Sequence, residues 1–205
     1  MPDNDIDKVF QRHGFFISRE TLEKLIIYQR LLHKWQPVVN LVGPATLEDA
    51  ATRHFFDSAQ VFRYVTDPAA RLVDIGSGAG FPGMILAMLG ATDVHLVESD
   101  VRKATFLREV SRETKTSVTI HDVRAEDCNI EGIRVLTARA LAPLRDLLRY
   151  TQDMKVEGYS LFMKGMQYQE EIDKARKAWN FEAEIFPSMT EMAGRIVKVT
   201  QLSKK

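Results

Sequence analysis

The sequence has one cysteine, no long apolar run and no excess of either charge. Cys128 alone cannot form an internal disulfide or a zinc site built from several cysteines, and a single cysteine is typical of a reducing cytoplasm. An apolar run of about 18 residues, the length that spans a membrane, does not occur. Residues 1–7 are acidic, whereas a secretory signal begins with basic residues. We therefore expect a soluble, cytoplasmic protein.

The charges balance completely. Lysine and arginine together number 28, aspartate and glutamate also number 28, and the formal net charge is 0. The protein as a whole therefore does not attract a polyanion, and any nucleic-acid binding must come from a local patch.

The length of 205 residues, 45% of them hydrophobic, suits one well-packed domain with an appendage. Residues 1–66 have helical patterns and are expected to form an N-terminal extension packed on the core. Residues 67–205 alternate strand and helix patterns, which predicts a single α/β unit. A dehydrogenase normally needs a separate catalytic domain, for which there is little room.

Two main helices are expected in the extension. One follows an N-cap at Ser18, and the next starts after Thr46, with Asp49 placed for a capping box. His54 and Asp57 are one turn apart on this second helix. A local pair that fixes helix packing is favoured for them over a direct catalytic role, which stays open.

The most informative stretch is residues 71–87, RLVDIGSGAGFPGMILA. Leu72, Val73 and Ile75 predict a buried strand, glycines follow directly, and a helical pattern begins at Pro82. Glycines adopt positive φ and let the backbone approach a ligand closely. An acid at the strand end and alternating glycines exceed what a simple turn requires, so we expect a ligand site.

One known motif in this turn is the dinucleotide fingerprint G-x-G-x-x-G, which Gly78, Gly80 and Gly83 match. Glu98 follows about 20 residues later, as that motif requires. The fingerprint should nevertheless start immediately after the strand. Counted in that way, its third glycine position holds Phe81, which argues against a dinucleotide.

The alternative motif is D-x-G-x-G-x-G, formed by Asp74, Gly76, Gly78 and Gly80, and its register fits the strand. It resembles the S-adenosylmethionine (SAM) turn of class I methyltransferases. That resemblance implies a Rossmann-like fold with a mostly parallel seven-stranded sheet, in which the aspartate orients the glycine loop and receives the methionine end of SAM.

Two further strand ends are expected to contact the cofactor, because ligands in doubly wound sheets lie outside the carboxyl ends of the strands. Glu98 ends the strand 94–97, and its carboxylate could accept hydrogen bonds from two ribose hydroxyls. Ala125 and Glu126 follow the strand 118–120 and should reach the adenine side. Residues 182–186 and 196–200 would close the sheet as an antiparallel pair.

The fourth strand, 134–138, bears on the chemistry. It ends at Arg139 without the Asn/Asp-Pro-Pro-aromatic motif typical of methyltransferases that act on exocyclic amines, and Cys128 is in no Pro-Cys context for attack on a pyrimidine carbon. A lone-pair acceptor such as guanine N7 needs positioning and charge but no general base. Arg139 and Lys164, which ends the fifth strand, are therefore the catalytic candidates.

The charge is locally uneven around these residues. From 134 to 164 there are six basic residues and three acidic ones, a balance of +3. A phosphate-bearing substrate would be consistent with this surplus. An ordinary solvated surface explains it equally well.

Together, several motifs resemble the bacterial 16S rRNA guanine-N7 methyltransferases, the glucose-inhibited division protein B family. The resemblance spans about residues 31–165. It is carried by Trp35 with Asn40-Leu41, Arg53-His54-Phe55-Phe56-Asp57-Ser58, the turn from Asp74 to Gly83, Glu98-Ser99, Arg124-Ala125-Glu126, Arg139-Ala140 and Lys164-Gly165. Phe56 departs from the leucine that is usual in the family, and only local repacking is expected there.

The resemblance implies methyl transfer from SAM to N7 of a guanosine in the 530 loop of 16S rRNA, leaving S-adenosylhomocysteine (SAH). No metal is implied. Carried over by position, the cofactor-binding residues would be Gly76, Phe81, Ala125, Glu126 and Arg139. Asp74, Gly78 and Glu98 join them from the motif reading.

The substrate form stays open between naked 16S rRNA and the small ribosomal subunit. Neutral net charge favours a structured substrate, and a monomer without membrane contact is expected. Three alternatives remain: a SAM-dependent methyltransferase of a small molecule or protein, an NAD-dependent oxidoreductase, and a non-enzymatic sensor or assembly factor that binds SAM and RNA.

Overall fold

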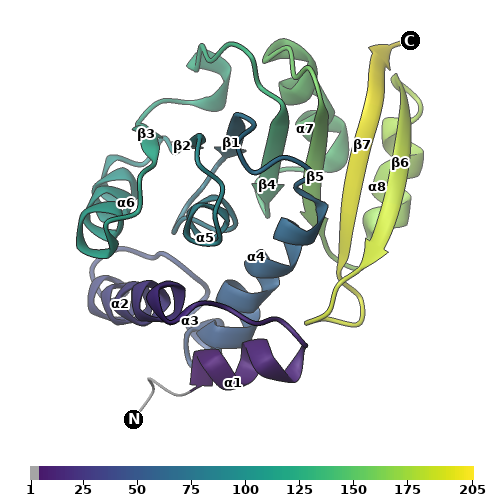
Figure 1. The fold of residues 1–205 in the computed structure, drawn as a ribbon. Helices are drawn as coiled ribbons and strands as arrows, with labels where there is room; N and C mark the ends of the chain where they lie inside the picture. The colour runs from purple at the N-terminus through teal and green to yellow at the C-terminus, as the bar shows by residue number, and fades with distance from the viewer. Residues whose placement is uncertain (1–4) are drawn as a thin grey trace.

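The computed structural model describes residues 5–205, and a seven-stranded sheet forms its centre (Figure 1). The strand order is β3-β2-β1-β4-β5-β7-β6. The first five strands pair in parallel, and β7 runs antiparallel between β5 and β6. The strands are β1 (Leu72–Ile75), β2 (Val94–Val97), β3 (Thr119–His121), β4 (Val135–Arg139), β5 (Tyr159–Lys164), β6 (Trp179–Pro187) and β7 (Arg195–Lys204).

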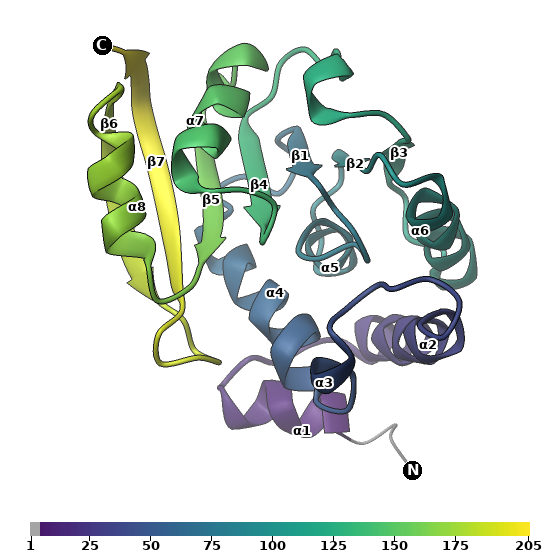
Figure 2. The same ribbon diagram turned by 180° about the vertical axis from the view of Figure 1, so that it is seen from behind.

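Helices pack on both faces of this sheet, as the two opposite views show (Figures 1 and 2). The α-helices are α1 (Asp5–Arg12), α2 (Arg19–Trp35), α3 (Pro44–Leu47), α4 (Asp57–Ala59), α5 (Gly83–Met88), α6 (Val101–Thr114), α7 (Leu144–Asp153) and α8 (Tyr168–Ala175). A π-helix, η2 (Ala51–Phe56), precedes α4. The 3-10 helices are η3 (Gln60–Tyr64), which follows α4, and η4 (Ala125–Asp127), which follows β3.

The two faces bury separate apolar clusters because side chains alternate along each strand. In β1, Leu72 belongs to the cluster beneath α2, α5 and α6, whereas Val73 and Ile75 belong to the cluster beneath α7 and α8. The expected α/β class, with a mostly parallel seven-stranded sheet, is confirmed by this arrangement. It is the topology of class I methyltransferases, with one antiparallel strand.

The N-terminal extension is helical and packs directly on the glycine turn. Ser18 caps α2 as expected, since its hydroxyl accepts the backbone N–H of Thr21 at 3.0 Å. Tyr28 of α2 is fully buried, and its hydroxyl donates to the carbonyl of Ala79 within the turn. The apolar cluster on this face includes residues from both the extension and the α/β part. The boundary at residue 66 remains a prediction from the sequence pattern.

Two expected element boundaries are wrong. The second long helical segment of the extension begins at Ala50, and the short α3 precedes it, so Asp49 makes no capping box after Thr46. Thr46 instead donates its hydroxyl to Gly43 O at 2.7 Å. The charged pattern of residues 168–179 also predicts an exposed helix that reaches Trp179. Instead α8 ends at Ala175, and Trp179 begins β6 with its indole buried in a sheet-face cluster.

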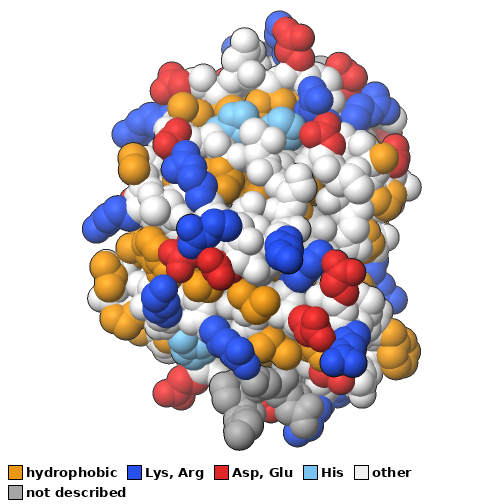
Figure 3. All heavy atoms as spheres, turned by 60° about the vertical axis from the view of Figure 1, so that its left-hand side comes forward, with side chains coloured by type: hydrophobic (Ala, Val, Ile, Leu, Met, Phe, Trp, Pro, Cys, Tyr) orange, Lys and Arg blue, Asp and Glu red, His pale blue; other side chains and the backbone are white. Residues whose placement is uncertain are grey.

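Charge is balanced in total, and on one face of the molecule it is also dispersed. In Figure 3, cationic and anionic side chains are interspersed over the face turned to the viewer. Ion pairs contribute to this mixing, for example Arg108 with Asp122 at 2.9 Å and Lys34 with Glu109 at 3.2 Å. Within residues 5–205, no helix combines the length and apolar character needed to cross a membrane.

Replacing Tyr28 by Phe tests how firmly the extension is bonded to the glycine turn. The variant leaves the buried Ala79 carbonyl without its donor, so the free energy of unfolding should fall by about 1–3 kcal/mol. Tyr150→Phe is the matched control: its hydroxyl bonds Glu126 at an exposed site, and its loss should cost under about 1 kcal/mol. Urea unfolding measures both variants, and equal losses would contradict a special role for Tyr28.

Candidate functional site

A cavity of about 560 Å³ opens at the carboxyl ends of β1, β4 and β5. It lies between the glycine turn, the helical segment η2–α4 and the loop that joins β6 to β7. Its lining includes Leu41–Gly43, Thr46, Arg53, His54, Asp57, Gln60, Gly76–Ala79, Phe81, Lys103, Arg139, Ala140, Met163–Gly165, Glu171, Ser188, Thr190, Glu191 and Gly194–Ile196. The volume falls in the range usual for small-molecule and cofactor pockets.

The glycine turn takes the conformation that its spacing predicts. Gly76, Gly78 and Gly80 have φ values of 62°, 57° and 94°, which favour glycine. At Gly80 there is also no room for a side chain, because a Cβ would stand 2.5 Å from the Tyr28 hydroxyl and 2.9 Å from Leu107. The turn is therefore fixed by backbone conformation and by packing beneath it.

Glu98 holds the turn from the end of β2. Its carboxylate accepts the Gly78 N–H at 2.7 Å through Oε2 and the Asp100 N–H at 2.8 Å through Oε1. Glu98 is buried, and it joins the glycine turn to the start of α6. Each carboxylate oxygen has a second lone pair, so these bonds leave acceptors for the ribose hydroxyls that we expect to bind there.

Asp74 lies beneath the turn rather than at the cavity wall. Its side chain is fully buried and accepts the Thr137 hydroxyl at 2.7 Å and the Gly83 N–H at 3.3 Å. Burial raises its pKa to about 6, although the hydrogen bonds from Thr137, Ser77 and Gly83 act in the opposite direction. In this arrangement Asp74 orients the loop, and direct contact with the methionine end of SAM stays a prediction.

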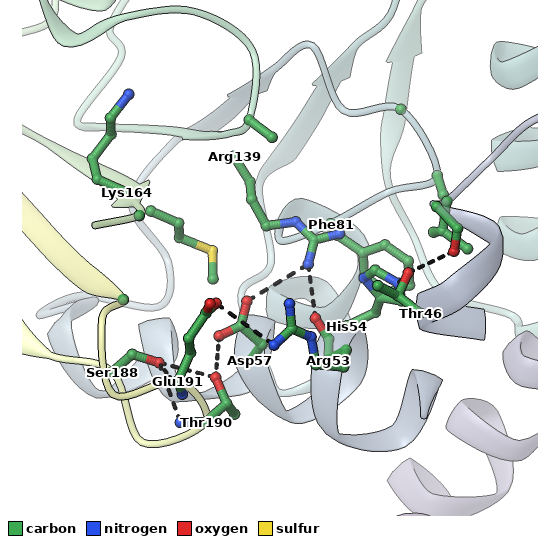
Figure 4. A pocket seen from close by; sticks show the side chains of 18 of the residues that line it. Thr46, Arg53, His54, Asp57, Phe81, Arg139, Lys164, Ser188, Thr190 and Glu191 are labelled. Carbon is green, nitrogen blue, oxygen red and sulfur yellow. Dashed lines mark hydrogen bonds and ion pairs between the residues drawn. The ribbon is translucent and has the colours of Figure 1, made fainter. Parts of the chain in front are cut away.

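Arg139, at the end of β4, lies at the centre of the residues labelled in Figure 4. Its guanidinium donates to the Arg53 carbonyl at 3.2 Å, faces Asp57 at 3.6 Å and lies 4.9 Å above the centre of the Phe81 ring. Burial lowers the pKa of Arg139, and the charge of Asp57 opposes that shift. The guanidinium is thereby held at the cavity wall as a fixed donor group.

Three side chains pack on the ring of Phe81. Its ring stacks with Tyr28 at 5.4 Å and with His54 at 5.3 Å between ring centres, in addition to carrying Arg139. Phe81 is only 2% exposed, so it can shape the cavity but offers little free surface to a ligand. A cofactor contact by Phe81 remains a prediction.

Asp57 receives three donors at the cavity wall. Thr190 Oγ1 donates to Oδ1 at 2.5 Å and Gln60 Nε2 donates to the same atom at 2.8 Å, while Oδ2 faces Arg139 at 3.6 Å. Burial raises the pKa of Asp57, and the Thr190 hydrogen bond and the charges of Arg139 and Arg53 lower it. Asp57 is therefore the acidic partner of Arg139.

His54 and Asp57 do not form the local pair that their spacing favours. The segment Ala51–Phe56 is a π-helix, which turns the two side chains away from the alignment of an α-helix. His54 Nε2 instead bonds Thr46 Oγ1 at 2.8 Å. Burial, followed by the charges of Arg139 and Arg53, lowers its pKa to about 3, so the imidazole is neutral at physiological pH.

Lys164, the other catalytic candidate, is bonded to Ala142 and Glu171 and not to the residues around Arg139. Its ammonium donates to the Ala142 carbonyl at 3.0 Å and pairs with Glu171 at 2.6 Å, and Glu171 also accepts the Leu144 N–H at 2.7 Å. In Figure 4 the Lys164 side chain points away from the group formed by Arg139, Asp57 and Arg53. Lys164 lines the same cavity but fixes the β4–α7 loop against α8.

The structure brings only part of the expected site together. Gly76, Gly78, Phe81, Arg139 and Lys164 line the cavity, and the buried Asp74 and Glu98 support its glycine turn. Ala125 and Glu126 lie in η4, outside the cavity lining, where Glu126 accepts the hydroxyl of Tyr150 at 2.9 Å. Their adenine contact therefore remains a prediction. Of the six basic residues between 134 and 164, only Arg139 and Lys164 line the cavity.

Sequence reasoning missed the β6–β7 loop. Ser188, Thr190 and Glu191 reach the cavity from the far end of the chain, and Glu191 faces Arg53 at 3.7 Å. No motif marks these residues, because their contacts lie more than 120 residues away in sequence. A short loop between two antiparallel strands at the sheet edge is the one signal that could have indicated them.

The residues present fit SAM. Gly78 presents an open cradle at the cavity, because a Cβ there would meet nothing nearer than Gly76 O at 3.8 Å. The buried carboxylate of Glu98 and the backbone groups of the glycine turn supply hydrogen-bonding partners for a ribose and a methionine end. Across residues 5–205, no group of three or more histidine, cysteine, aspartate or glutamate side chains is placed to hold a metal ion.

Asp74→Asn tests the buried carboxylate through the pH dependence of stability. Because its pKa is raised from 3.8 to about 6, the folded state favours the protonated form. Its contribution to stability is fully present below pH 3.8 and is lost as pH rises through 6. The stability of Asp74→Asn relative to the unsubstituted protein should therefore increase by about 2 kcal/mol between pH 4 and pH 7.

Urea unfolding at the two pH values measures this difference. Asp122→Asn is the control with the opposite sign, because the hydrogen bond from Arg108 lowers the pKa of Asp122. A stability difference for Asp74→Asn that does not change with pH would contradict a raised pKa.

Comparisons with known proteins identify the family to which the sequence is similar. The family model for rRNA small subunit methyltransferase G matches residues 21–198. A ribosomal RNA small subunit methyltransferase G from Paramagnetospirillum magneticum is 49% identical over 92% of each chain. Its counterpart from Rhodospirillum centenum is 45% identical over 94% of this chain and 89% of that one.

Solved structures support the fold alone. Magnesium protoporphyrin IX methyltransferase from Synechocystis PCC 6803, with bound SAM, has a TM-score of 0.59 and 11% identity, covering 90% of this chain and 97% of that one. Ribosomal protein L11 methylase from Lactobacillus delbrueckii has a TM-score of 0.55 and 16% identity, covering 73% and 77%. With the family match across the entire cavity lining, these findings lead to one conclusion: the chain belongs to the rRNA small subunit methyltransferase G family.

Proposed function

We propose that this protein transfers a methyl group from SAM to N7 of a guanosine in the 530 loop of 16S rRNA. The observation that carries the proposal is the coincidence of the family match with the cavity. Every residue that lines the cavity falls between 41 and 196, inside the matched range 21–198. SAM supplies an electrophilic methyl group on a sulfonium sulfur when it is bound there.

The side chains at the cavity suit an acceptor that carries no proton to remove. The lone pair of guanine N7 forms the new bond to carbon, the carbon–sulfur bond breaks, and its electron pair remains on sulfur. No general base is required. This agrees with His54, whose pKa of about 3 makes it a weak base, and with an Asp57 whose carboxylate is engaged by Thr190, Gln60 and Arg139.

Arg139 has a defined part in this scheme. Its guanidinium offers N–H donors at the cavity, and guanine presents O6 beside N7 on the same edge. Hydrogen bonding to O6 or to a nearby phosphate would orient the base while leaving the N7 lone pair free. The same rigid fork could not be replaced by a lysine, whose ammonium is a single point charge.

The cofactor is expected to lie over the glycine turn, with its ribose at Glu98 and its methionine end near Asp74 and Gly76. Ala125 and Glu126 would then approach the adenine, although they lie outside the cavity lining. We place the protein in the cytoplasm as a monomer, acting on 16S rRNA or on the small ribosomal subunit.

Arg139→Ala tests the proposed reaction. Loss of a preorganised donor at a reacting site typically lowers kcat by about 100-fold to 1,000-fold, so kcat/KM for rRNA should fall by at least about 100-fold. Arg149→Ala is the matched control, because this arginine lies on α7 outside the cavity lining. The measurement is transfer of labelled methyl from SAM to small subunits and to rRNA from cells lacking the gene, with the modified nucleotide mapped.

Label at one guanine N7 that disappears in Arg139→Ala would support the reaction and the role of the arginine. Label at another atom would contradict the assignment to N7. Transfer to neither RNA substrate, with SAH still bound, would redirect the search to small-molecule or protein acceptors.

A further inference from the structure

The β6–β7 loop packs on the helical segment α4–η3 through a set of specific bonds. Gln60 makes two of these bonds. Its Oε1 accepts the Met189 N–H at 2.7 Å, and its Nε2 donates to the Ser188 hydroxyl at 3.1 Å. Arg63 extends the contact outward by reaching the Met189 sulfur at 3.0 Å. The loop is thereby fixed against a segment about 130 residues earlier in the chain.

Among these contacts, Thr190 bonds to Asp57, the acidic partner of Arg139. Its hydroxyl donates to Asp57 Oδ1 at 2.5 Å, and the amide of Gln60 donates to the same oxygen at 2.8 Å. With Oδ1 held from two sides, the other oxygen, Oδ2, is turned toward Arg139 Nη1 at 3.6 Å. A carboxylate with both oxygens assigned in this way cannot rotate without breaking a hydrogen bond.

Thr190 is itself held in place by Ser188. Its backbone N–H donates to the Ser188 hydroxyl at 3.2 Å, and the hydroxyls of Ser188 and Thr190 lie 2.9 Å apart. Figure 4 shows these two side chains directed toward Asp57 from the loop. The chain of contacts therefore runs from the loop through Thr190 and Asp57 to the guanidinium.

We propose that Thr190 is a positioning residue for the methyl-transfer reaction, acting through Asp57 to hold the guanidinium of Arg139 at the cavity. The inference rests on the proposed function, because Arg139 is the residue that orients the guanine in that reaction. Thr190 does not touch the reacting atoms in this scheme. Its hydroxyl determines the direction in which the Asp57 carboxylate faces.

The charged surroundings of Asp57 give this role a pH signature. Arg139 and Arg53 favour its charged form, Glu191 opposes it, and the nearby His54 is neutral at physiological pH. The Thr190 hydroxyl also favours the charged form. Removing that donor should therefore raise the pKa at which Asp57 takes up a proton and releases Arg139.

The test is Thr190→Val, which keeps the shape of the side chain but removes the hydroxyl. We expect kcat/KM for rRNA to fall about tenfold, mainly in kcat, because a displaced orienting group loses near-attack geometry. The acid limb of the pH profile of kcat/KM should move to higher pH by about one pH unit. Thr190→Ser, which retains the donor, should restore both quantities to within about twofold.

A second variant separates positioning from simple loosening of the loop. Arg63→Gln removes the contact with the Met189 sulfur at an exposed site and leaves the bonds to Asp57 in place. Its pH profile should match that of the unsubstituted protein. An equal shift of the acid limb in Arg63→Gln, or an unshifted limb in Thr190→Val, would overturn the proposal.

The proposal and the proposed function can fail separately. The pKa of Asp57 is also measured by carbon-detected NMR of its carboxyl group, which needs no activity. If the unsubstituted protein methylates no RNA, the proposed function fails, and the positioning of Asp57 is decided by this pKa alone. A rise in Thr190→Val but not in Thr190→Ser supports the contact, and no rise in either overturns it.

Discussion

The buried carboxylate of Asp74 is the constraint on which the rest of the site depends. It lies near the end of the inner strand β1, where it bonds to Thr137 of the neighbouring β4 and to Gly83 at the start of α5. A buried acid is costly unless it is hydrogen-bonded, so these partners must be present for the fold to tolerate it. Once they are, the two strand ends and the glycine turn have fixed relative positions.

A second set of contacts joins distant parts of the chain around Arg139. The arginine comes from β4, its acidic partner Asp57 from the N-terminal extension, and Thr190 from the loop between the last two strands. None of these elements forms the cavity alone. The extension is therefore part of the site, in addition to covering one face of the sheet.

The sequence allowed prediction of the features that depend on local spacing. Strand β1, the glycine turn and α5 follow from an apolar run, three alternating glycines and a proline at the helix start. Glu98 was expected at the ligand site because it ends the next parallel strand. In the structure its carboxylate accepts the Gly78 N–H, which explains how a residue 20 positions away supports the turn.

The features that escaped prediction depend on distant contacts or on irregular backbone. Thr190 lies 133 residues from Asp57, and no local pattern links them. His54 and Asp57 have the spacing of an α-helical pair, but the π-helix before Asp57 breaks that alignment. Lys164 ends a strand at the cavity as expected, and its part in the chemistry stays a prediction. Its partner Glu171 could be identified only once α8 was in place.

The position of β7 in the sheet has a consequence for how the protein matures. Because β7 pairs with β5, and β6 lies outside it, the β5 edge stays open until residues 195–204 leave the ribosome. The glycine turn follows β1 and is therefore synthesised well before β7. The loop that carries Thr190 reaches the cavity when β7 pairs with β5. A chain that stops before β7 would therefore contain the glycine turn but would not hold Thr190 beside Asp57.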